Sequence, residues 1–450
     1  MHSLEQLRSG ALAGIRHLKL SGGLTEFPTE IFSLADTLEV LDLSGNRLTS
    51  LPENLPSLGK LRVLFCSDNQ FTVLPKVLGA CPRLSMVGFK ANQIQTVPAE
   101  SLPAKLRWLI LTDNRIEVLP PELGLCDQLQ KLMLAGNRLR VLPLTLASCT
   151  RLELLRIAAN QLKELPDWLL NMPRLSWLAY AGNPLAHSLE AQALNNTPVD
   201  IVTWSQLTLR CKLGEGASGI IHRADLRISD DDCRPVAVKL FKGVVTSDGL
   251  PECEMAACIS AGNHPNLIPV LGKVAGHPDA AHGLVMPLID GQFANLAGPP
   301  SLESCTRDVY SPETSFAPEA VLSMARSVAS VACHLHARGI MHGDLYGHNI
   351  LHCGQGRVVV GDFGAASFYP FKDASCAVSL ERLEVRAFGC LLEELVGRIN
   401  QDLRSTVLLV QLTTLIAACL CEIPAKRPLF AEIEQELAAI SSSDYRQLLR

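Results

Sequence analysis

The sequence predicts two structural parts, an α/β solenoid of about eight repeats (residues 1–200) and an α+β domain of two lobes (residues 201–440). Three observations lead to this prediction. Asparagine recurs about every 23 residues through the first part. This period stops near residue 200. The second part then carries a glycine-rich segment, a strand-like segment with a lysine, and two loops with aspartate, in that order.

The repeat is clearest in the segments LEVLDLSGNRLTSLP (38–52), LRVLFCSDNQFTVLP (61–75) and LQKLMLAGNRLRVLP (129–143). Its asparagines are Asn46, Asn69, Asn92, Asn114, Asn137, Asn160 and Asn183, and Gly23 takes this position in a degenerate first copy. The pattern L-x-x-L-x-L-x-x-N-x-L resembles the leucine-rich repeat family over about residues 1–190. The resemblance implies a stacked solenoid whose two ends need caps.

Each part of the repeat has a physical reason. Leucines at alternate positions of a short strand point to one side, and burying each of them contributes roughly 1.5–3 kcal/mol. An asparagine amide can bond the backbone of its own turn, so stacked repeats are expected to form a ladder of amides. The proline of each Leu-Pro pair directs the chain onto its return path on the convex side.

The strand positions between the leucines predict an apolar stripe on the concave face. One column is His17, Val40, Val63, Met86, Trp108, Lys131, Leu154 and Trp177, and its neighbour is Lys19, Asp42, Phe65, Gly88, Ile110, Met133, Arg156 and Ala179. A contiguous exposed apolar stripe usually marks a contact surface. We predict that a protein substrate or regulator binds here, through Val63, Phe65, Met86, Trp108, Ile110, Met133 and Trp177. The alternative is that a cap or the second part of the chain covers the stripe.

Composition excludes several classes of protein. The formal net charge of −5 gives no electrostatic footprint for nucleic acid. The apolar segment 406–423 is interrupted by Gln411, Thr413 and Thr414, so we expect a buried helix there and no membrane span. The fifteen cysteines are scattered and contain no C-x-x-C motif, which favours reduced thiols and a cytoplasmic location.

The second part opens with the glycine-rich segment Gly214-x-Gly216-x-x-Gly219. Alone, this pattern also fits a dinucleotide-binding turn, which joins a strand to a helix. Here both flanks have strand character, which favours a hairpin over phosphates, where glycines let the backbone approach closely. The strand-like VAVKLF follows and carries Lys239. The helical PECEMAACIS then offers Glu254 as an ion-pair partner for this lysine, with Glu252 as the rival.

Two loops with acidic residues complete the series. HGDLYGHNI (342–350) contains Asp344 and Asn349, and Asp362 begins the triplet Asp-Phe-Gly. Together with EVRAFGCLLEEL and AKRPLF, these segments resemble the eukaryotic-type protein kinase family over about residues 205–440. Plant receptor kinases share both modules but have a membrane span between them. Residues 186–204 contain no such span, so we expect a soluble, bacterial-type relative.

The kinase resemblance implies ATP and Mg²⁺ as cofactors and a role for each residue. Lys239, oriented by Glu254, would hold the α- and β-phosphates. Asp344 would accept or orient the proton of the attacking hydroxyl, and Asn349 and Asp362 are hard oxygen ligands that suit Mg²⁺. The expected catalytic residues are Asp344, Lys239 and Asn349; the expected nucleotide-binding residues are Gly214, Gly216, Gly219, Ala237, Lys239, Glu254 and Met286.

Some positions depart from the kinase pattern. Gly343 replaces the arginine that answers a phosphate on the activation loop, so activity is expected to be constitutive or governed by the repeats. Tyr346 stands where many kinases have lysine. Glu384 occupies the place of an aspartate, which deprives Arg427 of its usual partner and makes Glu381 the candidate substitute.

Three functions remain open at this stage. The preferred one is an ATP-dependent protein kinase that phosphorylates Ser or Thr hydroxyls of a protein recruited by the repeats. An H-G-D-L loop also resembles the aminoglycoside and choline phosphotransferases, but the Asp-Phe-Gly triplet and the segment AKRPLF (425–430) favour a protein kinase. A pseudokinase scaffold is disfavoured because Lys239, Asp344 and both expected metal ligands are present.

Overall fold

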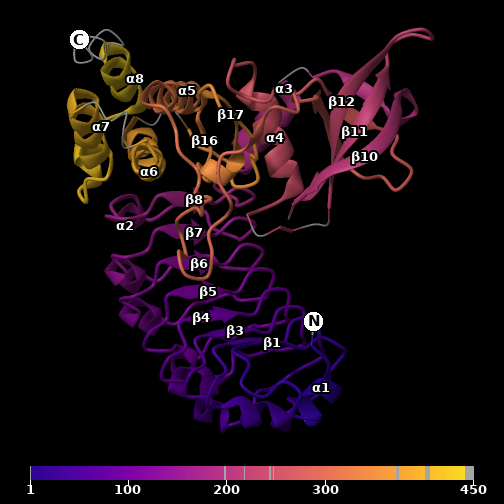
Figure 1. Ribbon diagram of the computed structural model, residues 1–450, viewed down its shortest axis with the longest axis vertical. Coiled ribbons are helices and arrows are strands. Elements are labelled where there is room, and N and C mark those ends of the chain that lie inside the picture. The colour runs from indigo at the N-terminus through magenta and orange to yellow at the C-terminus, as the bar shows by residue number, and fades with distance from the viewer. Residues whose placement is uncertain are drawn as a thin grey trace. The chain divides into compact units, whose positions relative to one another are not determined.

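The computed structural model describes residues 2–196, 199–216, 218–242, 245–246, 248–370, 374–400 and 406–440. Its contacts divide the chain into two compact units, Met1–Met172 and Pro173–Arg450. Figure 1 shows the order of the elements. The division falls before the boundary expected near residue 200, because the eighth repeat makes close contacts within the second unit.

The first unit is a ladder of short parallel strands, one for each repeat (Figure 1). They are β1 (His17–Lys19), β2 (Val40–Asp42), β3 (Val63–Phe65), β4 (Met86–Gly88), β5 (Trp108–Ile110), β6 (Lys131–Met133) and β7 (Leu154–Arg156), paired in chain order. The middle residue of each strand is only 0–1% exposed, as the alternation of leucines predicts. The two predicted columns are the first and third residues of these strands, aligned by their pairing.

Proline begins most of the return segments of this unit. Pro28, Pro75, Pro98, Pro120, Pro143 and Pro166 each cap a short 3₁₀ or α-helix in the extended conformation. The last of these helices is α2 (Asp167–Leu170). At the other end lies α1 (Leu4–Arg8), whose N-terminus is closed by a capping box between Ser3 and Gln6.

The asparagine ladder holds neighbouring repeats together. Asn114, for example, accepts a hydrogen bond from the Ile94 backbone N–H at 2.9 Å and donates to the Phe89 carbonyl at 2.9 Å. The ladder asparagines from Asn46 to Asn160 are 6–9% exposed. Each amide therefore satisfies buried backbone groups that no strand ladder reaches, which is why the position tolerates so little variation within this chain.

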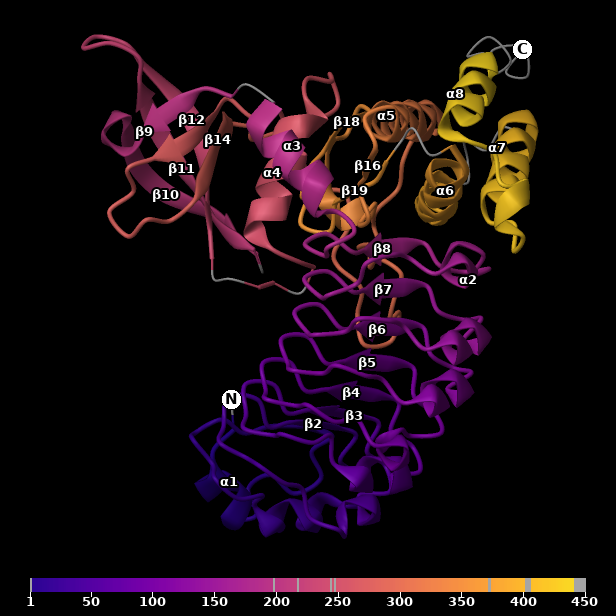
Figure 2. The ribbon, with the colours of Figure 1, turned by 180° about the vertical axis from the view of Figure 1, so that it is seen from behind.

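The second unit begins with the eighth strand of the repeat series, β8 (Trp177–Ala179), and α3 (His187–Asn196). A mixed sheet follows in the order β10-β11-β12-β14-β13-β9 (Figure 2). Its strands are β9 (Ile201–Thr203), β10 (Leu207–Glu215), β11 (Gly219–Arg227), β12 (Cys233–Phe241), β13 (Gly272–Ala275) and β14 (Gly283–Pro287). Helix α4 (Pro251–Ala261) packs on this sheet through Met255 and Ile259 against Leu284.

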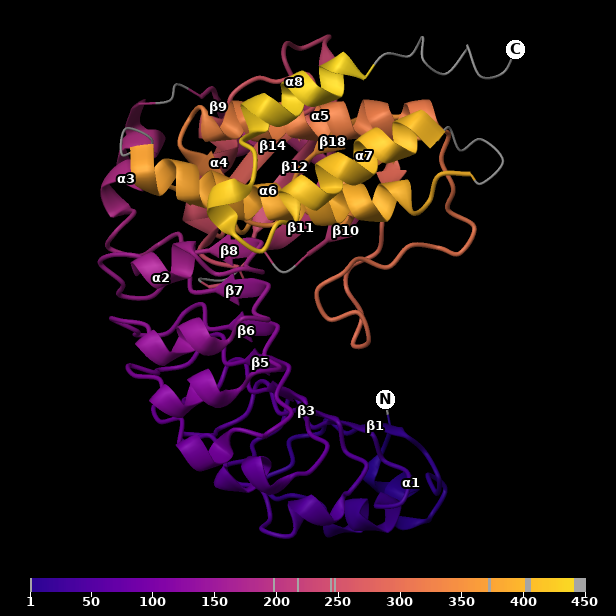
Figure 3. The same ribbon diagram turned by 90° about the vertical axis from the view of Figure 1, so that its left-hand side faces the viewer.

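The rest of the second unit is mainly helical (Figure 3). Its helices are α5 (Pro318–His336), α6 (Ala374–Val396), α7 (Thr406–Cys419) and α8 (Phe430–Ala439). Its short strands are β15 (Ala294–Asn295), β16 (Ile340–Met341), β17 (Ile350–Cys353), β18 (Arg357–Val360) and β19 (Ser367–Phe368). The expected buried helix at 406–423 is α7, but only one face is buried, since Val407 and Val410 are exposed. Among the described residues, no helix combines the length and apolar character that crossing a membrane requires.

Candidate active site

A cavity of about 520 Å³ lies at the glycine-rich hairpin of the second unit. This volume is in the range that small-molecule and cofactor sites occupy. Of the residues expected to bind nucleotide or metal, Gly214, Gly216, Ala237, Met286, Asn349 and Asp362 line it. Ala237 and Met286 are direct partners across β12 and β14, so the sheet register places both on the same wall.

The hairpin is formed by antiparallel β10 and β11, in agreement with the strand character of both flanks. Gly219 is not among the residues that line the cavity. A Cβ at this position would come within 2.5 Å of the Leu240 carbonyl oxygen, so Gly219 permits close packing of β11 on β12. Glu215 at the hairpin tip forms ion pairs with Lys212 and Lys242. The hydrogen bond from Lys212 lowers the pKa of the Glu215 carboxyl to about 2.

Lys239 and Glu254 form an ion pair in the interior, whereas Glu252 takes no part in it. Lys239 lies on β12 and Glu254 on α4, and their side chains are 12% and 2% exposed. Burial disfavours the charge on the lysine, but the nearby carboxylates of Glu254 and Asp362 raise its pKa above the usual value. The ammonium group therefore stays charged beside the cavity, as a group that neutralises phosphate must.

Asp344 and Asn349 lie in the catalytic loop, which we define as residues 342–349. The Asn349 amide nitrogen donates to the Asp344 carboxylate and to its backbone carbonyl, each at 2.9 Å. This orientation makes the amide oxygen of Asn349 the atom that could bind a metal ion. The hydrogen bonds also fix the direction of the Asp344 carboxylate, the group expected to receive a hydroxyl proton.

An antiparallel strand pair brings Asn349 and Asp362 together. Asn349 directly precedes β17, and Asp362 follows shortly after the paired strand β18. The Gly361 N–H donates to the Asn349 carbonyl at 3.1 Å and closes this end of the pair. Asp362 has a φ of 54°, a left-handed conformation that is uncommon for a residue with a side chain. Strain of this kind often occurs at functional sites, where the side chain must point in one direction.

The donor set fits a magnesium ion. A carboxylate and an amide oxygen line one cavity, and both are the hard ligands that Mg²⁺ prefers. Among the described residues, no group of three or more His, Cys, Asp or Glu side chains is placed to hold a metal ion. Two protein ligands are nevertheless sufficient for Mg²⁺, because this ion usually completes its shell with water and substrate phosphates.

Glu384 fixes the start of the catalytic loop. Its carboxylate, fully buried in α6, accepts hydrogen bonds from the backbone N–H groups of His342 at 3.1 Å and Gly343 at 2.6 Å. Burial opposes its charge, but the hydrogen bond from His336 and the surrounding positive charge lower the pKa of Glu384. A carboxylate one methylene longer than aspartate thus anchors this loop.

The prediction that Glu381 pairs with Arg427 is wrong. Glu381 accepts a hydrogen bond from the Phe430 backbone N–H at 2.7 Å. The buried Arg427 guanidinium donates instead to the carbonyl oxygens of Cys421, Arg382 and Pro173. Backbone carbonyls carry only partial charge, and burial of Arg427 accordingly lowers its pKa to about 10.

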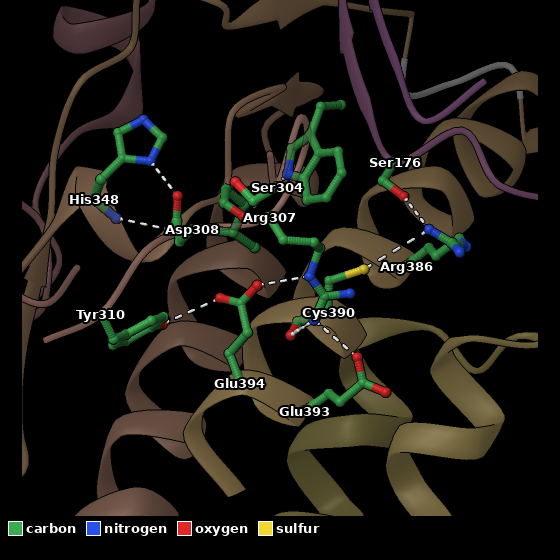
Figure 4. Close-up of polar contacts among 12 residues, drawn as sticks. Ser176, Ser304, Arg307, Asp308, Tyr310, His348, Arg386, Cys390, Glu393 and Glu394 are labelled. Carbon is green, nitrogen blue, oxygen red and sulfur yellow. Dashed lines mark hydrogen bonds and ion pairs between the residues drawn. The ribbon is translucent and has the colours of Figure 1, made fainter. Parts of the chain in front are cut away.

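A second set of contacts supports the other end of the catalytic loop (Figure 4). The Asp308 carboxylate accepts hydrogen bonds from the His348 backbone N–H at 3.1 Å and from its Nδ1 at 2.7 Å. The preceding residue, Arg307, donates to Glu394 at 2.6 Å and Glu393 at 2.8 Å, both near the end of α6. The segment between β15 and α5 is thereby attached to α6 and to the loop at once.

Sequence reasoning missed several of these residues. His348, Leu213, Glu215, Ile221, Ile268 and Leu351 also line the cavity. Asp308 lies far from every recognised motif, so its contact with His348 had no signal in the sequence. Glu384 did have a signal, since it stands at a position where the family pattern has an acidic residue.

The predicted partner-binding residues are not equally accessible. Phe65, Trp108 and Ile110 are partly exposed, whereas Val63, Met86 and Met133 are 1%, 2% and 9% exposed. The Phe65 ring lies over Gly88, where a Cβ would come within 2.5 Å of the ring. The prediction that Trp177 binds a partner on the open concave face is wrong. This tryptophan is 1% exposed and stacks on Tyr346 within the second unit, so it does not belong to an open surface.

Known families match both parts of the chain. Residues 207–386 match the family described as Protein tyrosine and serine/threonine kinase. Residues 104–162 match Leucine rich repeat, and residues 36–76 match Leucine Rich repeats (2 copies).

Three curated relatives are similar to part of the chain. Serine/threonine-protein kinase PITSLRE of Drosophila melanogaster is 27% identical over 160 residues, 35% of this chain and 16% of that protein. Cyclin-dependent kinase 11B of Mus musculus is 28% identical over 160 residues, 35% of this chain and 18% of that protein. Tyrosine-protein kinase receptor TYRO3 of Xenopus laevis is 24% identical over 280 residues, 53% of this chain and 32% of that protein.

The chain thus spans less than a third of the length of these relatives, whose names include both serine/threonine and tyrosine kinases. The repeat ladder and the two-lobed unit with its glycine-rich hairpin correspond to the two sets of matching residues. The chain therefore consists of leucine-rich repeats followed by a protein tyrosine and serine/threonine kinase domain.

Proposed function

We propose that this protein is an active kinase that transfers the γ-phosphate of ATP to Ser or Thr hydroxyls of a protein recruited by its repeats. One observation carries the proposal. A lysine, an aspartate and two oxygen ligands from distant parts of the sequence lie at or beside one cavity of nucleotide size. A scaffold that no longer transfers phosphate has no need for all of them.

Each residue has a task that follows from its chemistry. Lys239, held by Glu254, would neutralise the α- and β-phosphates, and the hairpin with Gly214 and Gly216 would cover them. Asn349 and Asp362 would hold Mg²⁺, which when bound neutralises phosphate charge. Asp344 would orient the acceptor hydroxyl and take its proton. Alignment and charge neutralisation supply most of the acceleration in this reaction.

The choice of acceptor rests on weaker support than the reaction. Two of the relatives described above are named as serine/threonine or cyclin-dependent kinases, and one is named as a tyrosine kinase. We favour Ser and Thr because the relative named as a serine/threonine-protein kinase is 27% identical and the relative named as a tyrosine-protein kinase receptor is 24% identical. A cytoplasmic location suits fifteen cysteines without a C-x-x-C motif.

The concave residues Phe65, Trp108 and Ile110 are proposed to recruit the protein substrate or a regulator. They are apolar and partly exposed, and they lie on β3 and β5, which are separated by β4. The Trp108 ring lies under the Lys131 ammonium at 4.3 Å. Partly exposed aromatic side chains are frequent anchors of protein interfaces.

Transfer of label from [γ-³²P]ATP tests the proposal. The full chain is incubated with Mg²⁺ and dephosphorylated casein, and in parallel with kanamycin and with choline. We expect label on casein Ser and Thr by phosphoamino acid analysis. Asp344→Asn should lower the rate by about 10²–10⁴-fold, whereas the exposed Asp279→Asn should leave it unchanged.

Other outcomes point to the alternatives. Label on kanamycin or choline alone would identify a small-molecule phosphotransferase. Label on tyrosine would correct the acceptor and keep the reaction. Binding of ATP without transfer to any acceptor would identify a pseudokinase scaffold.

A further inference from the structure

The eighth repeat, which we call the terminal repeat (residues 173–183), packs against the catalytic loop. It belongs to the same compact unit as the kinase elements. Trp177 of β8 stacks on Tyr346 of the loop with ring centroids 4.2 Å apart and planes 8° from parallel. The Trp177 indole N–H also donates to the Leu345 carbonyl at 3.3 Å. The tryptophan thus holds both a side chain and the backbone of the loop.

Gly343 shows that the terminal repeat occupies space which the kinase pattern gives to a side chain. A Cβ at Gly343 would lie 2.6 Å from the Leu178 carbonyl oxygen and 2.5 Å from that of Ala365. Gly343 also has a φ of 73°, which favours glycine. The two departures from the family pattern within the catalytic loop, Gly343 and Tyr346, therefore both lie where the terminal repeat contacts the loop.

Tyr180 extends the contact to the segment that follows Asp-Phe-Gly. Its backbone N–H donates to the Ser367 hydroxyl at 3.0 Å, and its own hydroxyl donates to the Phe368 carbonyl at 3.3 Å. Ser367 and Phe368 form β19, which pairs with β16 just before the catalytic loop. Tyr180 is fully buried, so these bonds are shielded from water.

Two arginines, one on α6 and one just before α8, attach the terminal repeat to the helical part of the second unit. Arg386 of α6 donates to the Ser176 hydroxyl at 2.8 Å (Figure 4), and Arg427 donates to the Pro173 carbonyl at 2.6 Å. Arg386 lies on α6, the helix that carries Glu384, and Arg427 also donates to the Arg382 carbonyl of α6 at 3.0 Å. The terminal repeat and the catalytic loop are therefore both attached to α6.

We propose that Trp177 and Tyr180 are positioning residues of the kinase reaction. By holding the catalytic loop and the segment 365–369 from the repeat side, they replace the support that a phosphorylated activation loop gives through the missing arginine at position 343. Catalysis then needs no phosphate on that segment. This inference rests on the proposed kinase function, because a positioning role needs a reaction to support.

Steady-state kinetics of full-chain variants test the proposal with ATP, Mg²⁺ and casein. Trp177→Ala should lower kcat by about 10–100-fold, because small displacements of catalytic groups are costly, while KM for ATP changes less than about twofold. Trp177→Phe keeps a stacked ring and should recover most of kcat. The control is Trp168→Ala in α2, a partly buried tryptophan of the preceding repeat that should leave kcat unchanged.

Hydrogen–deuterium exchange gives a readout that does not depend on activity. Trp177→Ala should speed exchange of amides in residues 342–349 and 365–369, and Trp168→Ala should not. Tyr346→Ala should produce the same change from the other side of the stack. The double variant should be no worse than either single one, since both remove one interaction.

Three results would overturn the positioning role. They are unchanged exchange and kcat in Trp177→Ala, fully multiplicative losses in the double variant, and loss of transfer after wild-type protein is treated with a phosphatase. If Trp177→Ala does not fold, Tyr346→Ala and Tyr180→Phe decide by the same measurements. Failure of wild-type protein to transfer phosphate would end the proposed function instead, and the exchange comparison would still decide whether the repeat holds the loop.

Discussion

At the scale of single residues, the Lys239–Glu254 pair is expected to serve the proposed function at the expense of stability. Two charges are removed from water, and their attraction only partly offsets the cost of desolvation. Lys239→Met leaves the Glu254 carboxylate buried without its cation, so the free energy of unfolding should fall by about 3 kcal/mol. Phosphate transfer should fall by about 10²-fold or more. Urea unfolding and the casein assay measure the two effects.

A double variant separates these two effects. Lys239→Met combined with Glu254→Leu removes both charges and should regain most of the stability without regaining transfer. The control is Lys76→Met, which breaks an ion pair with Glu100 whose side chains are 65% and 64% exposed and should cost less than about 0.5 kcal/mol. Equal losses of stability in the buried and exposed pairs would contradict this account.

His348 predicts a pH dependence at the cavity. Burial opposes its charge, but the hydrogen bond and negative charge of Asp308, with Asp344 and Asp362 nearby, raise its pKa above 6.5. A group whose pKa is raised on folding stabilises the folded state fully below the unfolded value, and loses this contribution as pH rises through the folded value. Stability should therefore fall as the pH rises from 6.5 through the higher pKa of folded His348.

The comparison of variants isolates this effect from other titrations. The difference in free energy of unfolding between wild-type protein and His348→Asn should shrink as the pH rises over this range. When both proteins also carry Asp308→Asn, the difference should disappear. The reference is the same substitution at His17, an exposed histidine on β1. A wild-type profile parallel to that of His348→Asn would show that the histidine carries no such charge.

At the scale of elements, the asparagine ladder is the feature whose stability should be most sensitive to a single substitution. Asn114→Ala removes the acceptor for the Ile94 N–H and the donors to the Phe89 and Leu111 carbonyls. Each unsatisfied buried backbone group costs about 1–3 kcal/mol. We expect a loss of roughly 3 kcal/mol by urea unfolding, against less than about 0.5 kcal/mol for the exposed Gln95→Ala. A loss no larger than that of the control would show that water replaces the amide.

The sequence predicted elements better than the contacts between them. Strand positions followed from the period, because alternate leucines must face one core. The roles of the lysine, aspartate and asparagine followed from the resemblance to protein kinases. What the pattern lacked was long-range contact. Trp177 looked like part of an open stripe because nothing in a repeat indicates that Tyr346, far along the chain, will stack on it. Arg427 likewise binds carbonyls, which every residue has, so no side chain signalled the partner.

At the scale of the whole molecule, the proposed function assigns recognition and chemistry to different sets of residues. The kinase domain supplies the cavity with Lys239, Asn349 and Asp362. The partly exposed apolar side chains Phe65 and Trp108 belong to the first unit. A substrate held by the repeats would reach the cavity at a raised effective concentration, without any change in the catalytic residues. Changes on the repeats should therefore alter the use of a recruited protein and leave the use of ATP as it is.

Phe65→Asp combined with Trp108→Asp tests this division of labour. The wild-type protein is first used to capture binding partners from a lysate of its own source. The captured proteins are then incubated with the wild-type protein and [γ-³²P]ATP, and the most strongly labelled one serves as the substrate. The double variant should lower kcat/KM for that protein by about tenfold or more. Loss of a buried aromatic anchor at an interface costs about 2 kcal/mol or more, which corresponds to more than tenfold in affinity. KM for ATP and the rate on casein should stay within about twofold, because neither substitution changes a residue that contacts ATP in the proposed function.

The control is Val118→Asp with Val141→Asp, two exposed apolar side chains outside the strands. Equal losses in both pairs would mean that the aspartates act through stability or net charge, and an unchanged kcat/KM in a folded Phe65→Asp, Trp108→Asp protein would place recruitment elsewhere.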